Sequence, residues 1–277
     1  MSIHDLDAEE IDLVEAICLD PSVPNKWKEV MAPCMEHRKD WLRDMMKQGL
    51  GVFIALGPKG GKLGLIEYCP LELASEPITK GNSLFINCMW VVPPAWKSGT
   101  AKALLNHTIE KAKSFGGLTV LGYEGDKWFG FMEYMPSSFF KRFDFQEMDR
   151  EGTRVLLHLD LGGKEKPSLL PSRKRAVSDS DKTLVEILFN SQCPWSGWMV
   201  DKVTRNLKKY DVVVKSVNTD GRSVLEEYGL SRGVCINGMP VLKRMGTVKE
   251  VEALVKEVAP RKKRRPSRTP HQHREGS

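Results

Sequence analysis

The sequence lacks three features that would each assign the protein to a class. Its six cysteines are scattered without a CxxC pair, which gives neither a zinc-ribbon pattern nor a secreted disulfide framework. No stretch approaches the roughly 18 apolar residues of a membrane-spanning helix. The acidic N-terminus, MSIHDLDAEEIDL, has neither the basic nor the apolar region of a secretory signal. We therefore expect a soluble, cytoplasmic protein, and its isolated histidines predict no metal site.

Most of the chain also lacks an excess of positive charge. The segment 261–277 contains seven Lys and Arg residues and one acidic residue, Glu275. This segment therefore accounts for the whole net charge of +6. Residues 1–260 are neutral overall and do not predict a nucleic-acid-binding surface. The low-complexity segment 260–277 is expected to be a disordered basic tail, with at most weak contact to nucleic acid.

The length of 277 residues favours two domains. The segment 162–182 contains Gly-Gly, two prolines and a basic cluster, which is typical of a linker. It separates a first domain, residues 1–161, from a second domain, residues 183–259. In the first domain, predicted helices and strands alternate in an order that indicates a mixed α/β sheet with helices on both faces.

The end of the first domain is expected to contain an aromatic loop with Trp128, Phe129, Phe131 and Tyr134. Two strands, residues 143–148 and 154–161, are expected to complete the domain.

The first domain is organised around the stretch from Leu84 to Ala112. The apolar run Leu84 to Val92, interrupted by Asn87, predicts a buried strand. Two prolines and a short turn containing Gly99 follow, and then a helix with apolar residues at helical spacing. A strand, a glycine-bearing turn and a helix N-terminus together present free backbone N–H groups that suit a phosphate or pyrophosphate.

These residues resemble the GNAT acetyltransferases. The loop Trp96-Lys97-Ser98-Gly99-Thr100-Ala101 corresponds to the family's Gln/Arg-x-x-Gly-x-Gly/Ala motif, and Pro136 to Arg150 resembles its later helix and "GF" segment. The resemblance implies an N-acetyltransferase that uses acetyl-CoA as co-substrate and acts on a small-molecule or peptide amine by direct transfer in a ternary complex. The residues implied to bind the cofactor are Val91, Val92, Lys97, Ser98, Gly99, Thr100, Ala101 and Lys102.

The sequence departs from the family pattern at three positions. Trp96 replaces the first Gln or Arg of the loop, Asp144 replaces the glycine of the "GF" pair, and Phe140 occupies the place of a tyrosine that protonates the departing thiolate. Phe140 has no proton to donate. A non-catalytic acyl-CoA-binding module is therefore the alternative function.

Candidates for the proton transfers come from other segments. Glu67, on the strand before Leu84, is the first candidate for the general base that accepts the amine's proton. Tyr134, or else Tyr123, is the candidate for the missing acid. Cys88 lies on the central strand, where a buried cysteine commonly acts as a small apolar side chain.

The second domain resembles a thioredoxin-like domain from Leu184 to Val258, with Cys193-Pro-Trp-Ser196 at the active-site position. A cysteine at a helix N-terminus has a stabilised thiolate, so Cys193 is a candidate for thiol-redox chemistry. Ser196 replaces the second cysteine, Arg232 stands near the family's cis-proline, and Cys235 is a distant candidate for a resolving thiol. The pairing of the two domains resembles the YoaP-like group of GNAT proteins.

Overall fold

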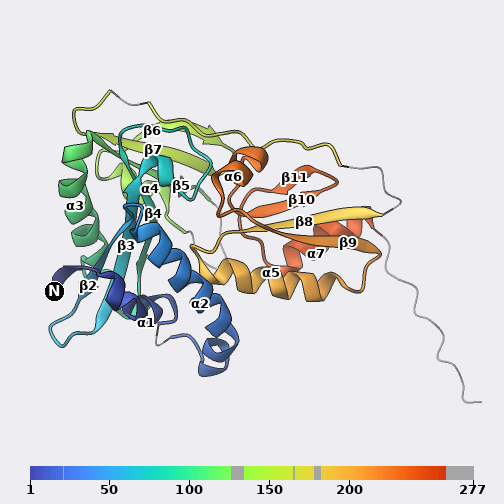
Figure 1. The fold of residues 1–277 in the computed structure, drawn as a ribbon, viewed down its shortest axis with the longest axis horizontal. Coiled ribbons are helices and arrows are strands. Elements are labelled where there is room, and N and C mark those ends of the chain that lie inside the picture. Colours follow the sequence, from blue (N-terminus) through green and yellow to red (C-terminus); the bar gives the residue numbers. More distant parts are fainter. Residues whose placement is uncertain (21, 126–133, 165, 178–181, 260–277) are drawn as a thin grey trace, which may run out of the picture.

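The computed structural model describes residues 1–20, 22–125, 134–164, 166–177 and 182–259, which form two units with one sheet each (Figure 1). The predicted mixed α/β architecture is confirmed, with helices against both faces of a mixed sheet. The tail 260–277 and the predicted aromatic loop residues Trp128, Phe129 and Phe131 lie outside the described residues.

The N-terminal unit is built on a seven-stranded sheet in the order β1-β2-β3-β4-β5-β7-β6, in which only β4 and β5 are parallel. Its strands are β1 (Ser2–Asp5), β2 (Gly51–Leu56), β3 (Lys62–Pro70), β4 (Leu84–Val91), β5 (Gly117–Tyr123), β6 (Gln146–Glu151) and β7 (Arg154–Asp160). Its helices are α1 (Glu15–Cys18), α2 (Asn25–Met46), α3 (Thr100–Ala112) and α4 (Ser137–Lys141), with 3₁₀ turns η1 (Ala8–Val14), η2 (Leu71–Leu73), η3 (Pro93–Ala95) and η4 (Lys113–Phe115).

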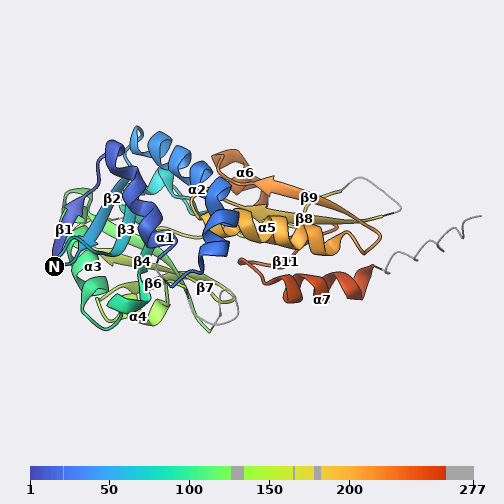
Figure 2. The same cartoon turned by 90° about the horizontal axis from the view of Figure 1, so that it is seen from below.

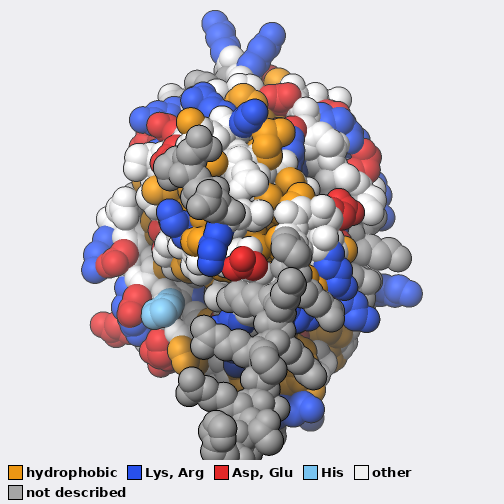
Figure 3. Space-filling model, turned by 90° about the vertical axis from the view of Figure 1, so that its right-hand side faces the viewer, with side chains coloured by type: hydrophobic (Ala, Val, Ile, Leu, Met, Phe, Trp, Pro, Cys, Tyr) orange, Lys and Arg blue, Asp and Glu red, His pale blue; other side chains and the backbone are white. Residues whose placement is uncertain are grey.

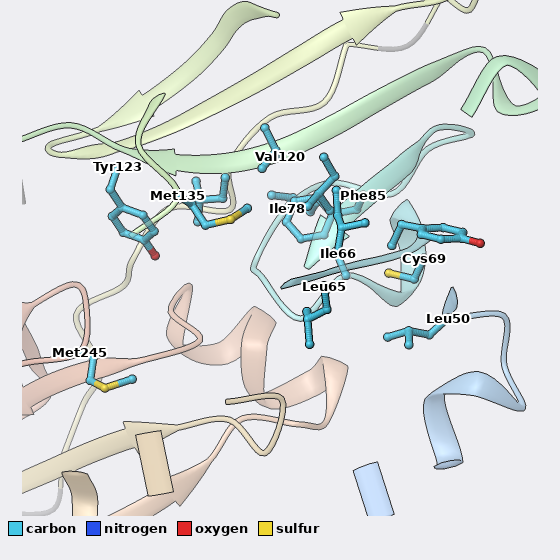
Figure 4. Packing of buried hydrophobic residues seen from close by; sticks show 14 of the residues in the cluster. Leu50, Leu65, Ile66, Cys69, Ile78, Phe85, Val120, Tyr123, Met135 and Met245 are labelled. Atoms are coloured by element: carbon cyan, nitrogen blue, oxygen red, sulfur yellow. The ribbon is translucent and has the colours of Figure 1, made fainter. Parts of the chain in front are cut away.

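Helices α1 and α2 cover one face of this sheet, and α3 and α4 cover the other (Figure 2). Successive side chains of a strand alternate between the two faces. Leu65 and Ile66, neighbours on β3, accordingly point in opposite directions, and both are fully buried (Figure 4). Burial on both faces explains why β2 to β5 lack the polar alternation of a half-exposed strand.

Strand β4 leaves its parallel neighbour β5 partway along its length. The two strands pair only from Leu84 to Ile86. At this point the register between β3 and β4 shifts, so that Asn87 is an extra residue on β4. The Asn87 side chain accepts hydrogen bonds from the backbone N and the hydroxyl of Ser75, at 2.9 and 2.8 Å. The polar interruption in the apolar run is therefore the bulge that opens one edge of β4.

The end of the N-terminal unit differs from the predicted boundaries. Strand β6 spans Gln146–Glu151 instead of residues 143–148, because the chain turns at Phe143 and adopts a φ of 64° at Asp144. Glycine, which the resembled family usually has at this position, adopts the left-handed conformation without a steric cost. Aspartate adopts it at a small cost. The hairpin to β7 is correspondingly tight, with Gly152 at a φ of 62°.

The C-terminal unit has a four-stranded sheet in the order β11-β10-β8-β9. Its elements are β8 (Thr183–Phe189), α5 (Pro194–Leu207), β9 (Val212–Asn218), α6 (Arg222–Tyr228), β10 (Gly233–Ile236), β11 (Met239–Leu242) and α7 (Val248–Val258). The hairpin between β10 and β11 turns at Asn237 and Gly238, both with positive φ. A capping box of Thr247 and Glu250 begins α7. Helix α2 of the N-terminal unit packs against α5 (Figures 1 and 2).

The described part of the segment 162–182 is bound to both units along its path. Leu169 forms a β-bridge with Ile78 of the N-terminal unit. Arg175 lies 3.9 Å from the ring centre of Tyr228 and forms a 2.9 Å ion pair with Glu186 of the C-terminal unit. The composition predicts a linker, but these contacts show that tertiary partners hold it in place.

No described helix is both long and apolar enough to cross a membrane. At the end of the molecule formed by the C-terminal unit, basic and acidic side chains lie interspersed over the described surface (Figure 3). That distribution is consistent with the neutral charge balance of residues 1–260.

Gly229, at the end of α6, packs tightly against the docked segment 162–182. It has a φ of 62°, and an added Cβ would lie 2.0 Å from the carbonyl oxygen of Pro171. Gly229→Ala should therefore lower the free energy of unfolding by more than the ~1–2 kcal/mol that left-handed backbone alone costs a non-glycine residue. Urea denaturation followed by tryptophan fluorescence measures the change.

Gly60→Ala is the matched control, because Gly60 has a φ of 74° and open space around its added Cβ. Equal losses for the two variants would show that the contact between Gly229 and the segment contributes nothing.

Candidate functional site

The loop between β4 and α3 presents a row of backbone N–H groups. Gly99, the N-cap of α3, has a φ of 84°, and Lys97 two residues earlier has a φ of 62°. Among the described residues, no backbone acceptor lies within reach of the N–H groups of residues 100–102, as is usual in the first turn of a helix. No atom lies within 4 Å of the place where a Cβ of Gly99 would stand. The loop therefore presents backbone N–H groups without an intramolecular backbone acceptor, next to open space.

The second half of β4 has a backbone edge turned away from β3. The Met89 N–H points to the sulfur of Met135 at 3.2 Å, and the Val91 carbonyl accepts a 2.7 Å hydrogen bond from the Trp96 indole. The N–H of Val92 is instead bonded to Leu63 of β3 at 2.9 Å. Both residues are predicted from the sequence to contact a cofactor. Val91, the last residue of β4, lies at the open edge, whereas the N–H of Val92, just after β4, points toward β3.

A cavity of about 560 Å³ lies beside this edge, between the two units. The N-terminal unit contributes residues of the α1–α2 connection, α2, β3 and β4, and the C-terminal unit contributes the start of α5. Its lining includes five of the seven tryptophans of the chain, namely Trp27, Trp90, Trp96, Trp195 and Trp198. This volume is in the range of pockets that bind small organic molecules.

Three cysteines line the same cavity, and they come from different elements. Cys193 is the N-cap of α5 and is half-buried, whereas Cys18 lies at the end of α1 and Cys88 on β4. Burial raises the pKa of the Cys18 thiol to about 11 and that of Cys88 still further. Cys235 lies elsewhere, in a separate cluster with Leu188 and Tyr228, and burial raises its pKa to about 12.

A buried ionic network closes the inner side of the junction. Arg38 of α2 donates to Glu67 of β3 and to the carbonyl of Gln192, and Gln192 donates to the second oxygen of Glu67 at 3.0 Å. Arg232 joins the network by donating to Gln192 at 2.5 Å and to Glu76 at 2.8 Å. All five side chains are less than a tenth exposed. Burial alone would lower the pKa of Arg38, but the Glu67 carboxylate beside it outweighs this and raises that pKa.

The predicted proton-transfer residues occupy different surroundings. Glu67 is fully buried, has both oxygens in the network and is not among the residues that line the cavity. Tyr134 does line the cavity, with its hydroxyl within hydrogen-bonding reach of the Cys88 thiol. Burial raises the pKa of Tyr134 well above its usual range, so the phenol stays protonated at neutral pH. Phe140 is completely buried and packs against Phe145.

Several site residues cannot be recognised in the sequence. Arg38 and Gln192 are 154 positions apart, and the hydrogen bond between them depends on how the two units dock. In the sequence, the tryptophans of α2 and α5 have the spacing of ordinary core residues. Helical spacing alone cannot distinguish a core residue from one that lines a cavity. The backbone N–H of Met89 points to the Met135 sulfur and makes no β-ladder bond to β5, because β4 has left β5 at that point. Among the described residues, no group of three or more His, Cys, Asp or Glu side chains is placed to hold a metal ion.

Comparison with known proteins gives one curated relative and several similar structures, while no protein-family model matches the chain. A Bacillus subtilis (strain 168) protein, the uncharacterized N-acetyltransferase YoaP, is 27% identical over 189 residues, which is 68% of this chain and 73% of that protein. The PaiA N-acetyltransferase from Thermoplasma acidophilum in complex with coenzyme A is 14% identical with a TM-score of 0.40, covering 58% of this chain and 99% of its own. The N-acetyltransferase YhbS from Escherichia coli in complex with CoA is 12% identical with a TM-score of 0.39, covering 58% and 81%.

Removing one side of the buried pair should strongly destabilise the protein. Arg38→Met leaves the Glu67 carboxylate buried without its cation, which typically costs about 3–5 kcal/mol of unfolding free energy. Arg43→Met, on the same helix, removes an exposed 2.8 Å pair with Asp40 and should cost at most ~1 kcal/mol. Urea denaturation of both variants measures the difference.

The double variant Arg38→Met/Glu67→Leu removes both charges and should recover most of the loss. If the double variant is as unstable as Arg38→Met alone, the damage comes from lost packing and the unpaired carboxylate is not its cause.

Proposed function

We propose that the protein is an acetyl-CoA-dependent N-acyltransferase that transfers the acetyl group directly to an amine in a ternary complex. The observation that carries the proposal is the open loop and helix N-terminus of α3 at the end of the diverging strand β4. The similarity to the Bacillus subtilis N-acetyltransferase, over 68% of this chain, supports the same activity.

In this proposal the pyrophosphate of CoA binds at the loop from Lys97 to Lys102. Free N–H groups and the positive end of a helix dipole both favour a doubly charged anion there. The positive φ at Lys97 and Gly99 turns successive N–H groups toward one side of the loop, as in other anion-binding nests. Trp96, half exposed at the start of the loop, supplies an aromatic surface in place of the Gln or Arg contact.

The thioester then extends along the open edge of β4 into the cavity. The N–H of Met89 is placed to stabilise the negative charge that develops on the acetyl oxygen, with the Met135 sulfur moving aside. An amine in the cavity attacks the acetyl carbon, the new C–N bond forms and the C–S bond breaks. Holding both reactants side by side supplies much of the rate.

Tyr134 supplies the proton that Phe140, at the family's usual acid position, cannot donate. Its protonated phenol donates to the departing CoA thiolate, and the proton that the amine nitrogen loses restores the phenol directly or through water. Glu67 has a positioning role in this scheme. Its two oxygens hold Arg38 and Gln192, so the amine has no direct path to it, and we assign it this role in place of the general base that the sequence suggests.

The C-terminal unit is, in this proposal, a thioredoxin-like accessory domain that forms one wall of the site. The β8-α5-β9 crossover with Cys193 at the N-cap of α5 supports this assignment. A thiol-redox function has less support. The hydroxyl of Ser196 is bonded to the Asn190 carbonyl at 2.7 Å, and Cys235 lies in a separate cluster. Burial raises the pKa of the two other thiols that line the cavity, Cys18 and Cys88.

Binding of acetyl-CoA to the full-length protein tests the proposed cradle. Isothermal titration should show binding that Ser98→Asp weakens by about tenfold or more, because the added carboxylate repels the pyrophosphate. The folded state should remain as stable, since a carboxylate at a helix N-terminus contributes about 0.3–1 kcal/mol in its favour.

Ser114→Asp, the same substitution just beyond the other end of α3, is the control and should leave the affinity unchanged. Absence of binding at millimolar acetyl-CoA would overturn the proposal, and binding without turnover across an amine panel would favour the non-catalytic alternative.

Tyr134→Phe should lower kcat by about 10²-fold, within the usual contribution of general acid catalysis, and leave KM for acetyl-CoA unchanged. Tyr123→Phe is the control, since its ring lies 6.4 Å from that of Tyr134 but outside the cavity lining, and kcat should stay within about twofold. Release of the CoA thiol in the presence of the best amine measures both. Equal rates for Tyr134→Phe and the wild type would remove Tyr134 from the mechanism.

A further inference from the structure

We infer that the cavity between the two units takes an acceptor with one amino group on an aromatic or other apolar body, and that α5 of the C-terminal unit selects it. This inference deepens the proposed function and rests on it. It follows from the chemistry of the lining, from the exposure of the tryptophans at the mouth and from the absence of a free carboxylate in the described lining.

The wall opposite β4 is a cluster of three tryptophans from both units. The ring centres of Trp27 and Trp198 are 4.9 Å apart, those of Trp195 and Trp198 are 5.8 Å apart, and those of Trp27 and Trp195 are 6.4 Å apart. The Trp195 indole donates a 3.2 Å hydrogen bond to the carbonyl of Cys18, which fixes its ring against α1. Large, rigid aromatic faces of this kind bind apolar and aromatic ligands at little cost in conformational entropy.

The mouth of the cavity exposes tryptophan to solvent. Trp27 is 37% and Trp96 is 52% exposed, although each lines the cavity. Exposed apolar side chains that line a cavity commonly mark a binding site. Trp96 belongs to the proposed CoA loop and Trp27 to α2, and both line the same cavity as Trp90 of β4.

The charges of the lining argue against a polycationic acceptor. Among the described residues of the lining, the charged ones are Asp20, Lys26 and Arg38. Asp20 is almost fully buried and accepts hydrogen bonds from the backbone N and the hydroxyl of Ser22, at 2.8 and 2.5 Å. Arg38 is positive and already paired with Glu67. A polyamine or an aminoglycoside would bring several ammonium groups to a wall with no available carboxylate, and burying an unpaired charge is costly.

The reacting nitrogen itself fits these surroundings. An apolar environment disfavours an ammonium ion relative to the neutral amine, and the neutral amine is the form that attacks the thioester. A compound with a single amino group thus loses its charge on entering and leaves no other charge unpaired. In this inference the C-terminal unit contributes to the site because α5 supplies the apolar wall that binds the body of the acceptor.

Acceptor binding is measured first, without turnover, by isothermal titration of the CoA-loaded full-length protein. The probes are tryptamine and phenethylamine as aromatic monoamines, and spermidine and kanamycin as polycations. We expect the aromatic amines to bind at least about tenfold more tightly than either polycation, a difference of ~1.4 kcal/mol. A polycation that binds as tightly as the aromatic amines, or no binding of either aromatic amine, overturns the inference.

Variants then locate the binding surface. Trp198→Ala should weaken tryptamine binding by about tenfold and leave CoA binding unchanged, and Trp198→Phe should recover part of the loss. Trp27→Ala, at a partly exposed position, gives the same test with less risk to folding. Phe115→Ala, at an exposed residue beyond α3, is the control. Unchanged tryptamine affinity in both tryptophan variants overturns the role of this wall.

A turnover assay separates the two proposals. Acetylation of tryptamine with release of the CoA thiol supports both. Tight tryptamine binding with no acetylation of any amine contradicts the acyltransferase function and leaves the apolar ligand site standing. Acetylation of spermidine or kanamycin, with no acetylation of an aromatic amine, supports the acyltransferase and overturns the inferred acceptor class.

Discussion

The buried network between Arg38, Glu67 and Gln192, continued by Arg232 and Glu76, is the constraint on which the rest of the site depends. It connects α2 and β3 of one unit to the start of α5 in the other. Breaking such a network leaves a charge in a medium that solvates it poorly, so the docked arrangement is strongly preferred over any partly separated one. The position of α5, and with it one wall of the cavity, therefore follows from an electrostatic requirement inside the protein.

The divergence of β4 from β5 is the second constraint, and it acts on the other side of the cavity. A strand that stays paired on both edges has no free backbone group for a ligand. After Asn87 the β4 backbone is released on one side while β3 still holds the other. The same divergence carries the chain to the loop at Gly99, so the proposed anion site and a free strand edge both depend on one bulge.

The sequence predicts the first unit far better than the site. The strand from Leu84, the loop at Gly99 and the helix after it can be recognised because local rules govern them: apolar burial, proline as a strand terminator and glycine at a positive φ. The boundary of β6 was misplaced because Asp144 adopts a glycine-like conformation that its residue type does not announce. Glu67 was singled out from its place on a strand, but its burial against Arg38 depends on a helix whose packing the pattern does not specify.

By itself, the sequence determined the order of helices and strands, the neutral charge balance of residues 1–260 and the glycine-bearing loop before α3, because each depends on the residues themselves or on close neighbours in the chain. Only the tertiary structure decided that the segment 162–182 is docked, that Trp27 and Trp198 share a wall and that Cys193 faces the same cavity as Cys88. The last two relations join residues more than a hundred positions apart. They arise from how two separately patterned units bury their polar and apolar surfaces against each other.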